Sequence, residues 1–154
     1  MKNVELLPEL NKKKTCEEVD KFFKNHVERL VLLAGSRLID LSSPNLSDAP
    51  SGSSFNNNQE NKLINGIDAQ NIVKSINDAL NRGIDPVSRK ILIGLYIKHD
   101  HWIDVQTVIY KEHTSFAKLR QRALLVFASS FEGWELKNHV DEPVKLNVYY
   151  PRSK

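Results

Sequence analysis

The sequence has a single cysteine, Cys16, so an internal disulfide is excluded, and with it the class of small disulfide-stabilised secreted domains. It has no apolar run approaching the roughly 18 residues of a membrane-spanning helix. The first residues, MKNVELLPELNKKK, lack the apolar centre of a secretory signal peptide. We therefore expect a cytoplasmic protein that does not enter a membrane.

The sequence also lacks the short motifs of several large enzyme classes. It has no phosphate-binding loop, no dinucleotide fingerprint, no HExxH and no GxSxG. Cys16 follows Lys14 near the start of a predicted helix, a position that lowers a thiol pKa, but no histidine or acid is placed to assist it. His99, Asp100 and His101 offer metal ligands without a fourth group at suitable spacing. We expect no enzymatic activity, no cofactor and no metal.

What the sequence does have is an ordinary globular composition with a small positive excess. Hydrophobic residues make up 40% and charged residues 27%, which suits one domain with a modest core or two small helical pieces. The 22 lysines and arginines exceed the 19 acidic residues, giving a net charge of +3. This charge permits an anionic partner without identifying one.

Apolar residues recur at helical spacing in five segments. The first predicted helix has capping-box spacing at its start, between Thr15 and Glu18. It is followed by a segment of Ser, Asn, Pro and Gly, typical of a flexible linker. The predicted helices cover Thr15–Leu41, Lys62–Arg82, a segment starting at Asp85 and Pro86, Trp102–Tyr110, and Thr114–Phe131.

We therefore predict an all-α helical bundle in four parts. These are an N-terminal helical element (1–41), a linker (42–61), a helix-turn-helix domain (62–133) and a C-terminal tail (134–154). In the tail, apolar residues alternate with polar ones from Val144 to Tyr150, which is typical of a strand. Such a strand needs a partner strand or subunit; otherwise the segment is an unstructured tail.

The last two predicted helices, joined at Lys111–His113, have the layout of a helix-turn-helix. The second helix of that motif needs cations for phosphates and short polar groups for base edges. A solvated basic helix face is the ordinary alternative. The phosphate candidates are Lys111, Lys118, Arg120 and Arg122, and the base-edge candidates are His113, Thr114, Ser115 and Gln121.

Four blocks occur in order along the chain: LLPELNKKKTCEEVDKFF, RLVLLAGSRLIDLSSPNLSDAPSG, IDAQNIVKSINDAL and FAKLRQRALLVFASSF. With these blocks the sequence resembles the ArpU-like family of phage-encoded transcriptional regulators over roughly Leu6–Gly133. The C-terminal part of that family is similar to region 4 of sigma-70-type factors. The resemblance implies a regulator of phage late or lysis genes, with duplex DNA and host RNA polymerase as its partners.

Three positions depart from the usual helix-turn-helix pattern. Gln106, Tyr110 and Glu112 stand where a small residue, a glycine and a serine cap are common, so we predict a remodelled turn with Thr114 as the cap. These departures favour an alternative, a protein-interaction co-regulator or anti-repressor without DNA contact. A DNA-packaging component, expected to form a ring, is a further alternative. The apolar stripe of the first helix fits intramolecular packing, polymerase contact or a homodimer equally.

Overall fold

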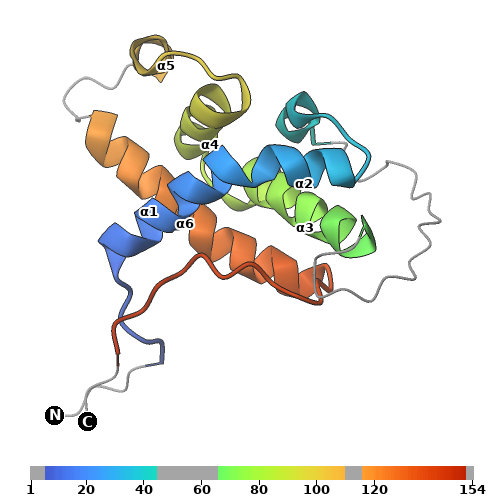
Figure 1. The fold of residues 1–154 in the computed structure, drawn as a ribbon. Helices are drawn as coiled ribbons and strands as arrows, with labels where there is room; N and C mark the ends of the chain where they lie inside the picture. The colour runs from blue at the N-terminus through green and yellow to red at the C-terminus, as the bar shows by residue number, and fades with distance from the viewer. Residues whose placement is uncertain (1–5, 45–65, 110–115, 152–154) are drawn as a thin grey trace, which may run out of the picture.

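The computed structural model describes residues 6–44, 66–109 and 116–151. Over these residues the chain forms six α-helices and no sheet, which confirms the all-α prediction. The longest helix, α6 (Phe116–Lys137), passes through the middle of the bundle. Three helices pack directly on it: α1 (Lys12–Asn25), α3 (Gly66–Asp78) and α4 (Pro86–Leu92) (Figure 1).

The first predicted helix is divided and begins earlier than expected. The side chain of Asn11 caps α1 by accepting a hydrogen bond from Lys14 N, so the prediction of a cap at Thr15 is wrong. The backbone leaves the helical region at His26, and α2 (Val27–Leu33) follows. The position of His26 on an apolar stripe of the sequence predicts a partly buried side chain, but His26 is exposed, so that prediction is wrong. Gly35, at φ 83°, ends α2, because glycine adopts this left-handed conformation without a steric penalty.

The next two helices, α3 and α4, both end in widened turns, and α4 begins at a cap that the sequence predicts. Asp85 caps α4 by accepting a hydrogen bond from Ser88 N at 3.1 Å, and Pro86 occupies the first turn, as the sequence predicts. Both α3 and α4 run on into π-helical segments, Ala79–Gly83 and Ile93–Ile97. The short helix α5 (Trp102–Ile109) then packs on α4 and its π-helical extension. The π-helical turns were not predicted.

An aromatic cluster joins the N-terminal helices to α6. The ring of Phe23 lies 4.9 Å from those of both Tyr96 and Phe127, and Phe22 lies 5.4 Å from Phe131. These residues belong to one hydrophobic core that also includes side chains of α2, α3 and α4. The element at 1–41 and the segment at 62–133 therefore share a core across the predicted linker.

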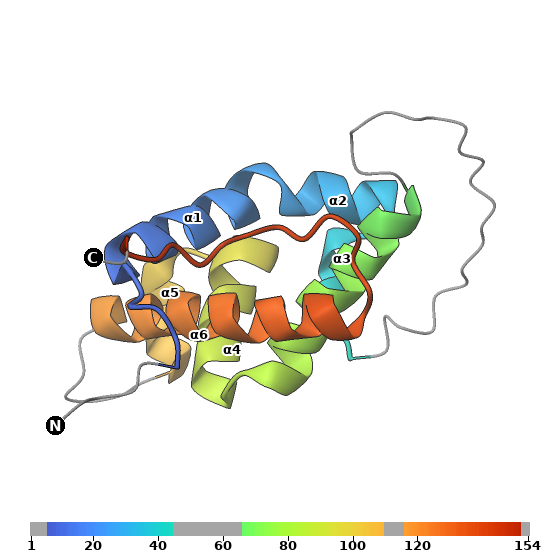
Figure 2. The ribbon, with the colours of Figure 1, turned by 90° about the horizontal axis from the view of Figure 1, so that it is seen from below.

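The segment after α6, residues 138–151, is here called the strap. It turns back and runs along α6 and α1 (Figure 2). Its apolar alternation buries Leu146, but among the described residues it forms one isolated bridge, between Tyr149 and Leu10, and no regular strand. Buried side chains hold the strap: Asp68 accepts from Asp141 N at 2.8 Å, Glu135 from Val144 N at 2.7 Å, and Thr15 from Val148 N at 2.9 Å. The tail is thus part of the fold, paired within its own chain.

Candidate nucleic-acid interface

The first described turns of α1 and α6 lie at the same end of the bundle, as Figure 2 shows. The Cys16 thiol donates to the carbonyl of Gln121 at 3.6 Å, which fixes the two helices in this register. The exposed cations of this end are Lys12, Lys13 and Lys14 of α1 and Lys118 and Arg122 of α6. We call these five residues the basic end.

The first half of α6 divides cleanly into an inner and an outer face. Ala123, Leu124 and Phe127 are buried in the core, while Phe116 and Leu119 are partly buried against it. Lys118, Gln121 and Arg122 are exposed. The spacing of Phe116, Leu119 and Ala123 in the sequence predicts that these three residues form an outer arc, and the structure confirms it.

Arg120 differs from the other predicted phosphate contacts. Its guanidinium donates to Asp20 Oδ1 at 3.0 Å and to the Tyr96 hydroxyl at 2.9 Å. The Tyr96 hydroxyl itself donates to Asp20 Oδ1 at 2.5 Å. Arg120 thus connects α6 to α1 and to the π-helical end of α4. The sequence already indicates this difference, because Arg120 is two residues from both Lys118 and Arg122, and residues two apart on a helix face in different directions.

The charges of this network are stabilised by their partners. Burial raises the pKa of Asp20, but the hydrogen bond from Tyr96 and the charges of Lys24 and Arg120 outweigh burial and hold the pKa below its ordinary value. Burial, together with the hydrogen bond to Asp20, raises the pKa of Tyr96 well above its ordinary value. At neutral pH the network is therefore a neutral phenol between a carboxylate and a guanidinium.

Arg122 is held much more loosely than Arg120. Its guanidinium lies 3.8 Å from Asp85 Oδ1, and its side chain is 62% exposed. Burial raises the pKa of Asp85, but hydrogen bonds from the Ser88 amide and hydroxyl outweigh it and keep the pKa below the ordinary value. An exposed ion pair of this length is worth under about 1 kcal/mol, so Arg122 can exchange Asp85 for another anion at little cost.

The four lysines of the basic end have no such partner. No carboxylate of the described residues lies within 4.0 Å of Lys12, Lys13, Lys14 or Lys118. A short run such as Lys12–Lys14 is most simply a solvated lead-in to a helix, and the sequence does not show that the start of α1 lies at the same end of the bundle as the start of α6. Together these side chains form a surface of positive charge that is free to meet an anion.

The thiol of Cys16 is in a different state from the one its sequence position indicates. Burial raises its pKa, and the positive charge of Arg120 offsets this only in part. The expectation of a lowered pKa from Lys14 and the helix start is therefore wrong, because contact with α6 removes the thiol from water. Cys16 acts as a packing group between the two helices.

The structure describes the two helices of the predicted helix-turn-helix but not the turn between them. Tyr110, Glu112 and four candidate contacts lie outside the described residues: Lys111, His113, Thr114 and Ser115. On the near side, Gln106 is exposed, so its longer side chain does not press into the bundle. Trp102 of α5 stacks on Phe116 of α6, with ring centroids 6.1 Å apart. This stacking is the contact that joins the two helices at the basic end.

The loop His99–His101 is exposed and takes part in local bonding. His101 Nδ1 accepts a hydrogen bond from Ile103 N at 3.2 Å, at the start of α5. In the parts of the chain that the structure describes, no group of three or more His, Cys, Asp or Glu side chains could hold a metal ion.

Within the described parts of the chain, no helix has the length and apolar character needed to cross a membrane.

Comparison of the chain with protein-family models, with curated proteins and with solved structures found no match.

Proposed function

We propose that the chain is a DNA-binding transcription regulator of the ArpU-like kind, encoded by a phage and acting on late or lysis genes. The observation that carries the proposal is the basic end, where Lys118, Gln121 and Arg122 are exposed on α6 and the start of α1, with three exposed lysines, lies at the same end of the bundle. Cations and an amide on one helix face supply phosphate contacts and base-edge contacts together. Lys111, His113, Thr114 and Ser115 remain predicted contacts, and host RNA polymerase remains a predicted partner.

In this proposal Arg120 is a positioning residue. Its ion pair with Asp20 holds α1 against α6, with the starts of the two helices at the same end of the bundle. Lys118 and Arg122 then contact phosphates of one duplex, while Gln121, one helical step away, faces the bases. Arg122 leaves its weak pair with Asp85 when a phosphate is present.

The test is a salt titration of binding to a mixed-sequence DNA duplex. Each phosphate contact contributes roughly −0.9 to the slope of log affinity against log salt concentration. Replacing Lys118 and Arg122 by alanine should therefore weaken binding and make the slope less steep by about 1.8. The matched control replaces Arg29 and Lys137, which are exposed elsewhere on the bundle, and should leave affinity and slope near those of the wild type. Equal losses in both double variants would contradict the proposal.

A second candidate, the protein-interaction co-regulator, is favoured by α5. Trp102 and Ile103 are each 50% exposed and Val108 is 68% exposed, so much of this short helix presents apolar surface. Apolar surface of this kind is typical of protein-interaction sites. The salt titration separates the two functions, because the co-regulator predicts no salt-dependent affinity for the duplex.

A further inference from the structure

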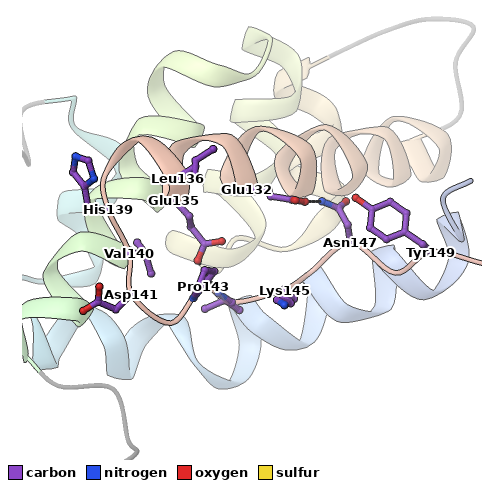
Figure 3. Close-up of a pocket in the computed structure, with 11 residues that line it drawn as sticks. Glu132, Glu135, Leu136, His139, Val140, Asp141, Pro143, Lys145, Asn147 and Tyr149 are labelled. Carbon is purple, nitrogen blue, oxygen red and sulfur yellow. Dashed lines mark hydrogen bonds between the residues drawn. The ribbon is translucent and has the colours of Figure 1, made fainter. Parts of the chain in front are cut away.

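A cleft lies between the second half of α6 and the strap (Figure 3). Its volume is about 720 Å³, within the range of roughly 300–1,000 Å³ that is usual for small-molecule sites. Val140, Pro143 and Val144 supply apolar walls, Leu136 lies at the rim with 81% of its surface exposed, and Tyr149 closes one end with an aromatic ring. The Tyr149 end of the cleft lies next to the start of α1, since Tyr149 bridges Leu10, but none of the five residues of the basic end lines the cleft.

Carboxylates dominate the polar part of the cleft. Asp141, Glu135 and Glu132 are spread along its length in that order (Figure 3). The basic residues of the lining are Lys145 and His139. Both are exposed, as are Glu132 and Asp141, so Glu135 is the one buried titratable side chain of the lining. The cleft therefore favours a positively charged occupant over an anion.

Two buried oxygens of the cleft lack a hydrogen-bond donor. Among the described residues, three buried side-chain oxygens have no hydrogen-bond partner: Asp78 Oδ1, Glu135 Oε1 and Asn147 Oδ1. Asp78 Oδ1 has Arg82 as an ionic partner at 3.7 Å. The other two both belong to residues that line the cleft. Buried polar atoms without a partner are costly, so two in one cleft indicate a missing hydrogen-bond partner.

Glu135 is the more informative of the two because its side chain is fixed. It is 2% exposed, and Figure 3 shows its carboxylate directed from α6 toward the strap. Its Oε2 accepts from Val144 N at 2.7 Å, which leaves Oε1 as the unpaired atom. The side chain of Asn147 also has one paired and one unpaired atom. Its Nδ2 donates to Glu132 Oε1 at 2.5 Å, and its Oδ1 accepts no hydrogen bond.

We propose that this cleft binds an organic cation whose ammonium groups are separated by methylene chains, a linear polyamine being the simplest case. Ammonium groups donate to Glu135 and Asn147 and face Glu132 and Asp141, while the methylene chain contacts the apolar walls. Tyr149 offers a ring face to a terminal ammonium group. A single metal ion would fill only a small part of the cleft and leave the apolar walls uncovered.

The test is calorimetric titration of spermidine into the full chain in the absence of DNA. We expect saturable binding of one spermidine per chain, weakened about tenfold or more in Glu135→Gln, because a charged hydrogen bond is lost. Glutamine still accepts the hydrogen bond of Val144 N, so this variant keeps the strap in place. The control Glu28→Gln removes an exposed carboxylate of α2 and should bind as the wild type does.

Two further readouts make the outcome specific. Burial, with the nearby charges of Glu132 and Asp68, raises the pKa of Glu135 to about 7, so an ammonium group must displace a proton there. Asp141 and Lys145 of the strap and His139 at its turn face the same cleft. Spermidine should thus bind about tenfold more weakly at pH 6 than at pH 8 in the wild type, and by a smaller factor in Glu135→Gln. The amide resonance of Val144 should also shift on titration.

The same titration can overturn the proposal. No saturable binding below about 1 mM would do so. Equal affinity in the wild type and Glu135→Gln would also do so. So would full competition by magnesium chloride at equal charge, since that would indicate general attraction to surface carboxylates.

Discussion

At the scale of single residues, Arg120 and Lys118 illustrate two different uses of positive charge. They lie two positions apart on α6, yet one is bonded to Asp20 and Tyr96 and the other has no carboxylate of the described chain nearby. A half-buried hydrogen bond to a charged group stabilises the fold, whereas an exposed lysine contributes little to stability. Substitution therefore separates the residue that holds the helices from the residue that is available to a partner.

Arg120→Ala should lower the free energy of unfolding by about 1–2 kcal/mol, because Asp20 loses a charged partner at a half-buried position. Lys118→Ala should change it by less than about 0.5 kcal/mol. Urea denaturation of the two variants beside the wild type measures both values. A larger loss in Lys118→Ala than in Arg120→Ala would mean that the two side chains have been assigned the wrong roles.

Glu135 should make the stability of the fold depend on pH. Its pKa is raised from 4.5 to about 7 in the folded chain, so the folded state retains a proton that the unfolded state has released. The stability that this retained proton contributes to the folded state is fully present below pH 4.5 and is lost as the pH rises through about 7. Between pH 5 and pH 8 the wild type should lose about 2 kcal/mol relative to Glu135→Gln. Parallel stability curves for the two proteins in urea would contradict this.

At the scale of elements, the burial of side chains on other helices determines where α6 ends. The predicted helix ends at Phe131, shortly before Gly133, yet α6 continues to Lys137. No atom lies within 4 Å of the place where a Cβ of Gly133 would be, while Phe131 and Glu135 on either side are buried. Contacts with other helices therefore carry α6 through a residue of low helix propensity.

Local signals in the sequence predicted the helical class, the start of α4 and the outer arc of α6, because capping and periodicity act over a few residues. They could not predict the π-helical turns, the division at His26 or the position of the strap, which depend on packing between segments far apart in the chain. The same limit applies to the site. Lys12 and Lys13 become part of the basic end only because α1 lies in register with α6.

The close contact between Gly83 and α6 is a test of this packing. A Cβ at Gly83 would lie 1.9 Å from Ser130 Oγ and 3.0 Å from the indole nitrogen of Trp134. Gly83→Ala should therefore cost about 1–3 kcal/mol of stability, and adding Ser130→Ala should recover part of that loss. Thermal unfolding of the single and double variants checks both expectations. Additive losses in the double variant would show that Ser130 is not the obstructing group.

At the scale of the whole molecule, the strap ties the two ends of the chain to the bundle. Its backbone bonds to side chains of α1, α3 and α6, and Leu146 is 5% exposed. The register of α1 on α6, and with it the basic end, depends on these contacts as well as on the core.

Leu146→Ala should lower the free energy of unfolding by about 2–4 kcal/mol through the cavity it leaves. It should also speed hydrogen exchange in α1. The neighbouring exposed residue provides the control, since Lys145→Ala should do neither. If α1 kept its protection in Leu146→Ala, the strap would not be what holds this helix.

The central claim is that the basic end contacts duplex DNA, and amide chemical-shift mapping during titration with a mixed-sequence duplex at low salt tests it most directly. The account predicts that the largest shifts fall at residues 116–122 and 12–14 and are reversed by added salt. Shifts concentrated on α2, α3 or the strap, or no shifts at low salt, would contradict it.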